Sequence, residues 1–302
     1  MRTIRHFLEY IFFETASGLL GMLPLRWARR LGGWLGEKVF TVLGFRRGVI
    51  LENLRHAFPH STPDALERLA RGSFRSVGTS LFELLRFPSL SREQIKSMVQ
   101  FSDHDLFHRS FARKKGVILL TAHFGNWELV PQAVCIHTEC PFLILYKVQS
   151  NRWIDARIAE RRAMFGNQVI PMGMAVREML RVLNEGKGVA MASDQSAPRE
   201  SIRMDFFGRE VPVFQGVASF ALKTGAALIT AFAIRQPDGT YRIGCREIPF
   251  DDLANNEGGI GELTSRHLRA TEAIIREYPE QWMWMHRRWK HVSEEKNEEE
   301  AA

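Results

Sequence analysis

The sequence predicts an α/β protein in which helices flank a mixed, mainly parallel β-sheet. Between residues 116 and 277, short apolar runs rich in β-branched residues alternate with amphipathic stretches of helical length. Strands that alternate with helices pair mostly in parallel, and the helices then cover both faces of the sheet. The composition agrees, because 45% of the 302 residues are apolar and 25% are charged, which excludes an intrinsically disordered chain.

The amino-terminal segment, residues 1–47, is predicted to be a helical membrane anchor. Its run from 7 to 25 holds 12 apolar residues among 19, which is long enough to span a bilayer, and arginines flank it on both sides. Glu14 weighs against a span, since an acid in the middle of a membrane helix costs on the order of 2.5 to 3.5 kcal/mol. A spanning helix, an interfacial helix and a buried core helix therefore all stay open. The interleaved basic and aromatic residues that follow suit a lipid headgroup region.

Residues 48–101 are predicted to form an all-helical region ahead of the sheet. Pro63 begins one helix there, with Ser61 or Thr62 as its cap, and Pro88 ends the apolar run of that helix.

One domain is expected over residues 48–292, because no Pro-, Gly- or Ser-rich linker divides them. The tail, 293–302, carries five Glu and one Lys and is expected to be disordered. The whole chain has a net charge of +7 and the tail has −4, which leaves +11 on the rest. Such an excess suits an anionic partner, and charge alone does not choose among a membrane surface, a phosphorylated substrate and nucleic acid.

The elements of the sheet follow in chain order. Strands are expected at 116–121, 142–146, 169–171, 188–192, 227–234 and, as an edge strand, 241–248. Helices are expected at 127–136, 153–165, 174–184, 217–224 and 262–277. In an open sheet of this kind, ligand sites form beyond the carboxyl ends of the strands.

The densest group of reactive residue types follows the first strand, in the string Thr121-Ala122-His123-Phe124-Gly125-Asn126-Trp127-Glu128-Leu129. Gly125 permits a tight turn and Asn126 can cap the next helix, which would bring the Glu128 carboxylate within reach of the His123 imidazole. A carboxylate that fixes the histidine tautomer is a common way to make a general base. The alternative is that the two residues only cap a helix or fill the core.

This string resembles the bacterial lipid A biosynthesis acyltransferases, relatives of the glycerolipid acyltransferases with their His-x4-acid motif. Further blocks agree with that family in order and spacing: Leu145-Tyr146-Lys147 with Asn151, Arg161-Arg162 with Gly166, Asp194-Gln195, Phe206-Phe207-Gly208, and Pro279-Glu280-Gln281-Trp282 continuing to Lys290. The resemblance covers residues 7–290. It departs at Lys147-Val148, where the family commonly has Arg-Pro, and this difference bears on the acceptor more than on the reaction.

The resemblance implies a fold like that of the glycerolipid acyltransferases and transfer of a fatty acyl chain from the thioester of acyl carrier protein to a hydroxyl of a lipid A precursor or similar anionic glycolipid. His123 would act as the general base, Glu128 would orient it, and no acyl-enzyme intermediate is needed. Substrate-binding roles fall to Asn126, Lys147, Asn151, Arg161, Arg162, Asp194, Phe207 and Gly208. The resemblance also implies a location at the inner membrane, with the catalytic domain on the cytoplasmic side.

Several of these residues also have an alternative interpretation, in which they only stabilise the fold. Asp194 follows the strand at 188–192 and either orients a substrate or caps a turn. The turn at 205–208 presents aromatics that we expect to be exposed, for an acyl chain or a membrane, unless they pack in the core. The block 282–290 is expected to be a terminal strand with its basic residues near a phosphate, and its His286 is a weaker rival to His123.

No metal or nucleotide cofactor is indicated, because Walker A, HExxH and strand-linked GxGxxG patterns are missing from the sequence. Cys135, Cys140 and Cys245 are not spaced as zinc ligands and cannot all pair, which favours a reducing compartment. The oxyanion is expected to meet backbone N–H groups near Gly125 or an arginine. The rival functions are acylation of another lipid, such as a glycerophospholipid or an aminolipid, and non-catalytic binding to membranes or nucleic acid. The resemblance favours acyl carrier protein and a membrane glycolipid as partners over nucleic acid.

Overall fold

A computed structural model describes residues 2–101 and 103–291 of the protein. The acidic tail predicted at 293–302 therefore lies outside the described residues.

In the described part of the chain, the main sheet has seven strands in the order β1-β9-β8-β2-β5-β3-β4. Neighbouring strands are parallel except for β8 and β9, so the predicted mixed, mainly parallel sheet is confirmed. The strands are β1 (Val99–Phe101), β2 (Val117–Thr121), β3 (Phe142–Tyr146), β4 (Gln168–Pro171), β5 (Gly188–Ala192), β8 (Ala227–Arg235) and β9 (Tyr241–Glu247).

Two predictions are wrong, the edge position of the strand at 241–248 and the all-helical region at 48–101, and one pair of strands was missed. The strand at 241–248 does not lie at the edge, because β1 pairs with it in parallel and was hidden in the region read as all-helical. A short antiparallel pair, β6 (Arg203–Asp205) and β7 (Glu210–Pro212), encloses the turn at 205–208 and was not predicted.

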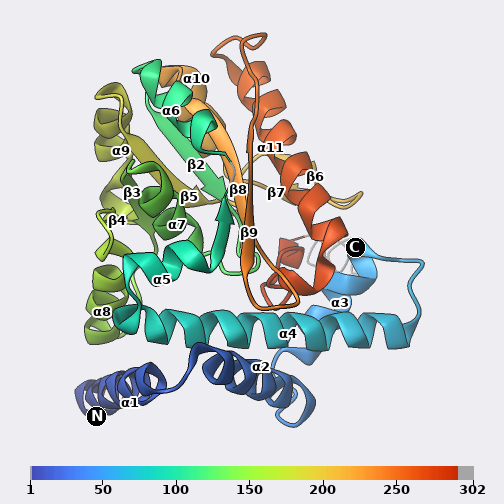
Figure 1. Cartoon of the computed structure of the whole chain (residues 1–302). Helices are drawn as coiled ribbons and strands as arrows, with labels where there is room; N and C mark the ends of the chain where they lie inside the picture. Colours follow the sequence, from blue (N-terminus) through green and yellow to red (C-terminus); the bar gives the residue numbers. More distant parts are fainter. Residues whose placement is uncertain (1, 102, 292–302) are drawn as a thin grey trace.

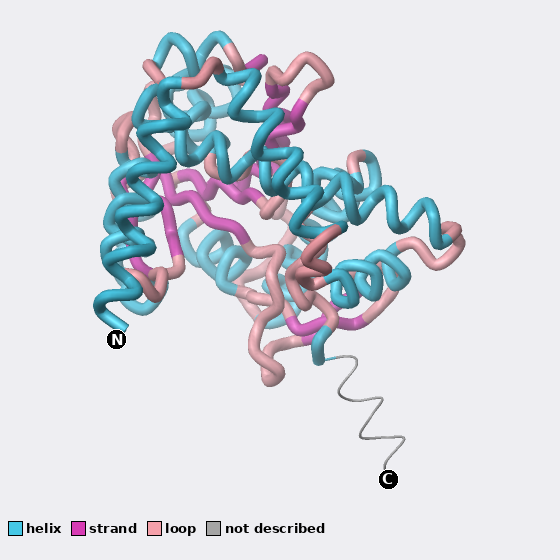
Figure 2. Tube along the Cα trace, turned by 90° about the horizontal axis from the view of Figure 1, so that it is seen from below, coloured by secondary structure: helices cyan, strands magenta, loops and turns pink. Residues whose placement is uncertain are grey.

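Helices lie on both faces of the sheet, as the two views show (Figures 1 and 2). Their bounds are α1 (Arg2–Met22), α2 (Leu25–Thr41), α3 (Arg47–Ala57), α4 (Pro63–Arg86), α5 (Arg92–Ser97), α6 (His104–Ala112), α7 (Leu129–Thr138), α8 (Arg152–Ala163), α9 (Ala175–Asn184), α10 (Gly216–Thr224) and α11 (Glu257–Glu277), with 3-10 helices at Phe87–Ser89, Met172–Met174 and Pro279–Gln281.

The two faces of β2 bury alternate side chains in two different clusters. Val117 and Leu119 pack with residues of α5, α6 and α7. Ile118 and Leu120 pack with residues of α9 and α10 on the opposite face. A strand buried on both faces explains the continuous apolar run that marked β2 in the sequence.

The predicted start and end of α4 are confirmed. Thr62 caps the helix, since its hydroxyl oxygen accepts a hydrogen bond of 3.3 Å from the Ala65 N–H. The helix ends at Arg86, and Pro88 lies in the 3-10 turn that follows.

The amino-terminal run predicted at 7–25 lies in α1 up to Met22, and a second helix, α2, begins after Pro24. Among the described residues, no helix is both long and apolar enough to cross a membrane. Glu14, the acid that weighed against a span, faces α8, where its carboxylate lies 3.6 Å from the Arg157 guanidinium and 3.8 Å from that of Arg161. These two arginines explain why the run tolerates an acid.

The carboxyl-terminal block is not the strand predicted at 282–290. Trp282 makes a single bridge with Phe124, and turns follow it. The aromatic side chains at 206 and 207, predicted to be exposed, are 0% and 5% exposed because they pack against three tryptophans of this block. The aromatic cluster consists of Phe206, Phe207, Trp282, Trp284 and Trp289.

Helices α2 and α4 cross at a point where only glycines fit, and they lie side by side in Figure 1. A Cβ added to Gly36 would lie 2.2 Å from the Phe74 carbonyl oxygen, and one added to Gly78 would lie 2.3 Å from that of Gly32. Backbone atoms cannot give way as a flexible side chain can, so these glycines set the distance between the two helices.

Replacing Gly78 by Ala is therefore predicted to lower the free energy of unfolding by about 1–3 kcal/mol, the usual effect of overpacking. Gly48→Ala in α3 is the control, because its added methyl group would meet open space, and we expect no loss of stability. Urea unfolding followed by circular dichroism measures both. A Gly78→Ala midpoint equal to that of the wild type would contradict the close helix crossing.

Candidate active site

His123 and Asp194 meet because two neighbouring parallel strands end in register. Thr121 at the end of β2 pairs with Ala192 at the end of β5. His123 and Asp194 each follow two residues later, and the His123 Nδ1 lies 2.8 Å from Asp194 Oδ1. The pair thus lies at the carboxyl edge of the sheet, where α/β proteins form their sites.

Both oxygens of the Asp194 carboxylate accept hydrogen bonds. Oδ1 accepts from the His123 ring, and Oδ2 accepts from the His123 backbone N–H at 2.9 Å and from the Trp282 indole N–H at 2.8 Å. Burial of the carboxylate would raise its pKa, but the nearby imidazole and these donors outweigh burial and lower the pKa of Asp194 to about 2. The carboxylate is therefore ionised at neutral pH.

This carboxylate also controls the imidazole of His123. Burial alone would lower the pKa of His123, but the charge and hydrogen bond of Asp194 outweigh it, and the pKa is raised. With Nδ1–H donating to Asp194, the neutral ring presents its lone pair at Nε2. The side chain is 24% exposed, so a substrate can reach it. The Gln195 amide nitrogen lies 3.3 Å from Nε2, and the Trp127 ring packs beside the imidazole at 5.4 Å.

Glu128 does not make the expected hydrogen bond to His123. Its carboxylate binds Arg162 through two hydrogen bonds, of 2.8 Å from Nε and 2.5 Å from a terminal nitrogen, and accepts a third, of 3.2 Å, from the Trp127 indole. It lies just ahead of α7 with its carboxylate toward α8, where Arg162 draws it into a buried ion pair. The negative charge of Glu128 still contributes to the raised pKa of His123.

Gly125 shapes the loop that carries His123. Its φ is +54°, and an added Cβ would lie 1.9 Å from the Ala233 carbonyl oxygen, so the predicted need for glycine holds. Its N–H donates to the Gln281 carbonyl at 2.8 Å, and its carbonyl accepts from the Ser80 hydroxyl at 2.6 Å. The Gly125 N–H is thus occupied, so the expected oxyanion donors near Gly125 do not include its own N–H.

The side chain of Asn126 hydrogen-bonds within the protein and stabilises the loop that carries His123. Its side-chain oxygen accepts from the Leu129 N–H at 3.1 Å, which confirms the predicted capping role. Its amide nitrogen donates to the fully buried Glu83 at 2.8 Å. Glu83 also accepts from Tyr241 and Arg29, each at 2.5 Å. The buried Glu83 network therefore ties the loop to α2, α4 and β9.

Two residues expected to bind substrate contact α1 instead. Asn151 donates from its amide nitrogen to the His6 carbonyl and to the Glu9 carboxylate, at 2.8 and 3.0 Å, while its side-chain oxygen caps α8. Arg161 is buried and donates to the Ser17 hydroxyl at 2.9 Å. Both residues dock α1 on α8.

The remaining predicted site residues make no hydrogen bond to His123 or Asp194 in the described part of the chain. Lys147 is exposed after β3, and the structure shows no side-chain partner for it among the described residues. Phe207 and Gly208 form the turn between β6 and β7 with positive φ angles of 58° and 74°. His286, the rival histidine, has a pKa lowered to about 4 by burial, and no carboxylate in the described part of the chain hydrogen-bonds to it.

Sequence reasoning placed Asp194 at the correct edge of the sheet but missed its bond to His123. The signal is the register, since each residue lies two positions beyond its strand. Counting two positions outward from the ends of the two apolar runs, Thr121 and Ala192, reaches His123 and Asp194.

Comparisons with known proteins find one family model and several relatives. A family model described as "bacterial lipid A biosynthesis acyltransferase" matches residues 2–291. The chain is 24% identical over 241 residues to the phosphatidylinositol mannoside acyltransferase of Mycolicibacterium smegmatis, covering 78% of this chain and 77% of that protein. From Escherichia coli, it is 24% identical over 267 residues to the lipid A biosynthesis palmitoleoyltransferase, covering 86% and 84% of the two chains. It is 25% identical over 285 residues to the lipid A biosynthesis lauroyltransferase, covering 90% and 88%.

The Asp194→Asn variant is predicted to titrate His123 at lower pH than the wild type. The substitution removes the charge that raises the pKa of His123 and leaves burial, which lowers it. A pH titration of the His123 ring protons by NMR measures the shift, with Asp64→Asn on the exposed start of α4 as the control. An unchanged His123 titration in Asp194→Asn would contradict the assigned pair.

Proposed function

The chain belongs to the bacterial lipid A biosynthesis acyltransferase family, and on this premise we propose that it transfers a fatty acyl chain from the thioester of acyl carrier protein to a hydroxyl of a lipid A precursor or a similar anionic glycolipid. Family membership supports acyl transfer to a lipid acceptor. The observation that carries the proposed mechanism is the buried Asp194 carboxylate on Nδ1 of His123, which leaves Nε2 as a base.

In the proposed reaction, His123 Nε2 takes the proton of the acceptor hydroxyl as its oxygen attacks the thioester carbonyl. A C–O bond forms, the tetrahedral oxyanion collapses, and the C–S bond breaks. The imidazolium then returns its proton to the departing thiolate. Asp194 stabilises the imidazolium through the transfer and holds the ring in the productive tautomer, as the third group of a catalytic triad does. The products are the acylated lipid and the free thiol of the carrier.

We propose that Glu128 acts on His123 through its charge and through Arg162 rather than by contact. The Trp127 ring packs beside the imidazole and its indole N–H donates to Glu128, so the ion pair lies near His123, and it fixes the start of α7 on α8. Of the predicted basic residues, Arg162 is the one whose charge acts on His123, so we propose that the N–H donors it does not use for Glu128 meet a phosphate of the acceptor.

We also propose that α1 and α2 lie in the headgroup region of the inner membrane, with the sheet on the cytoplasmic side. Large apolar side chains on these helices are exposed although they are costly to leave in water. They include Ile4, Phe7, Leu8, Ile11, Phe12, Leu19, Met22, Leu23, Trp27, Leu31, Trp34 and Leu35.

A second acceptor class is favoured by one comparison. The Mycolicibacterium relative is named for acyl transfer to phosphatidylinositol mannoside. A glycerophospholipid-based acceptor is therefore the alternative, and it uses the same residues for the same chemistry.

His123→Ala is predicted to lower acyl transfer at least about 10³-fold, because the general base is lost. The assay incubates detergent-purified protein with acyl carrier protein thioesters of several chain lengths and candidate acceptors, and follows the products by mass spectrometry. His108→Ala, at an exposed position on α6, is the matched control and should keep full activity. A wild-type protein inactive with every lipid hydroxyl offered, or an active His123→Ala variant, would contradict the proposal.

The two carboxylates should differ in the same assay. Asp194→Asn is predicted to lower kcat by about 10³- to 10⁴-fold, since the amide no longer holds Nδ1–H. Glu128→Gln is predicted to lower it by less than about 10²-fold, since Glu128 does not touch the ring. Circular dichroism of each variant checks that the fold is kept. The opposite order of effects would show that Glu128 is the partner that activates His123.

A further inference from the structure

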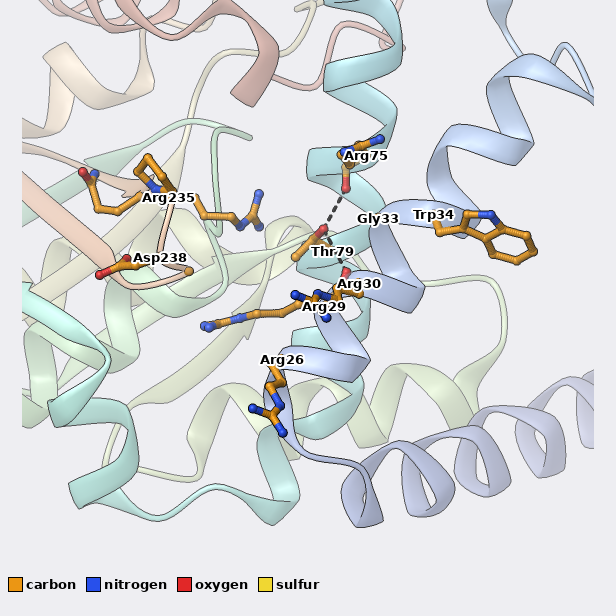
Figure 3. Close-up of a pocket in the computed structure, with 12 residues that line it drawn as sticks. Arg26, Arg29, Arg30, Gly33, Trp34, Arg75, Thr79, Arg235 and Asp238 are labelled. Carbon is orange, nitrogen blue, oxygen red and sulfur yellow. Dashed lines mark hydrogen bonds between the residues drawn. The ribbon is translucent and has the colours of Figure 1, made fainter.

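A cavity of about 470 Å³ lies between α2, α4 and the turn that joins β8 to β9 (Figure 3). Neither His123, Asp194 nor Glu128 lines it, so it is distinct from the acyl-transfer site. The cavity is lined by one acidic residue, Asp238, and by five arginines. The arginines are Arg26, Arg29, Arg30, Arg75 and Arg235.

Three of these guanidiniums already have carboxylate partners behind the cavity wall. Arg29 and Arg235 both reach Glu83, at 2.5 and 3.5 Å, and Arg75 pairs with Glu37. Because one carboxylate serves two guanidiniums, this set keeps a positive excess. Asp238 offsets that one excess charge, so the surplus of the cavity comes from its other two arginines.

The other two arginines are uncompensated. Arg26 and Arg30 are exposed on the first turns of α2, and no carboxylate in the described part of the chain pairs with either. One terminal nitrogen of Arg29 is buried without a hydrogen-bond partner. Figure 3 shows Arg29 reaching from α2 toward the side where Arg235 and Asp238 lie. The cavity thus combines unused N–H donors with surplus positive charge.

Exposed apolar side chains of α2 lie beside the cavity. Trp34 lines its rim and is 54% exposed, and Trp27 and Leu31 on the same helix are 50% and 38% exposed. Tryptophan with arginine is the combination that lies at the level of lipid headgroups. A concave site of this size can enclose a small phosphate-bearing headgroup.

We propose that this arginine cavity binds the phosphate of an anionic lipid headgroup and docks the protein on the membrane. Guanidiniums match phosphate oxygens in geometry and charge, and the exposed aromatics beside them would enter the headgroup layer. Docking at this cavity does not depend on acyl transfer at His123, so an experiment can contradict either proposal without contradicting the other.

The test is the binding of the full chain to vesicles of phosphatidylcholine with and without phosphatidic acid, measured by flotation. Arg26→Gln/Arg30→Gln removes the two uncompensated charges and leaves no buried acid unpaired. We expect it to bind phosphatidic acid vesicles roughly ten- to thirty-fold more weakly, given the usual contribution of a basic residue near an anionic membrane. The control, Arg68→Gln/Arg177→Gln, removes two exposed arginines elsewhere and should change binding less than about threefold.

Binding of glycerol 3-phosphate, measured by calorimetry, distinguishes a lipid from a free phosphate ester. Loss of glycerol 3-phosphate binding in Arg26→Gln/Arg30→Gln with unchanged vesicle binding would overturn membrane docking in favour of a soluble ligand. Equal weakening in both double variants would overturn the cavity in favour of overall charge. Loss of acyl carrier protein binding alone would assign the surface to the carrier. Retained vesicle binding by His123→Ala would support a docking site independent of catalysis.

Discussion

The buried carboxylate of Asp194 joins three distant parts of the chain, and the candidate site depends on it. A buried charge is tolerated only where donors surround it, and here the donors come from the ring and backbone of His123 after β2 and from the indole of Trp282 near the carboxyl end. The register of β2 against β5 brings His123 and Asp194 together. The aromatic cluster then holds Trp282 in place.

A second buried acid, Glu83, supports the same loop from the opposite side. It links Asn126 of the loop to Tyr241 of β9 and to two arginines of the cavity, Arg29 and Arg235. Helix α2, which carries exposed apolar side chains, is therefore fixed to the loop that carries His123 by one hydrogen-bond network. Under the proposed placement of α2 at the membrane, this network would set the distance between the membrane surface and His123.

The residues that fold locally could be predicted from the sequence, and those that depend on distant partners could not. The apolar run of β2, the positive φ of Gly125 and the capping by Asn126 are local properties, and each prediction was confirmed. The partner of His123 lies 71 residues away and that of Glu128 lies 34 residues away, so spacing within one motif favoured the wrong contact.

Whether the turn at 205–208 and strand β9 are covered also depends on residues that are distant in the sequence. The sequence of the turn at 205–208 predicts exposed aromatics, but three tryptophans distant in the sequence cover them. The sequence of β9 predicts an edge strand, but β1, which lies in a region of helices, pairs with it.

The tautomer of His123 tests the central claim most directly. A long-range nitrogen–proton correlation spectrum of the wild-type protein, labelled with ¹⁵N in histidine and recorded above the pKa of His123, shows which ring nitrogen carries the proton. The structure predicts a protonated Nδ1, donating to Asp194, and a bare Nε2. A proton on Nε2 and a bare Nδ1 would contradict the account, because Asp194 could not then be the group that prepares His123 as a base.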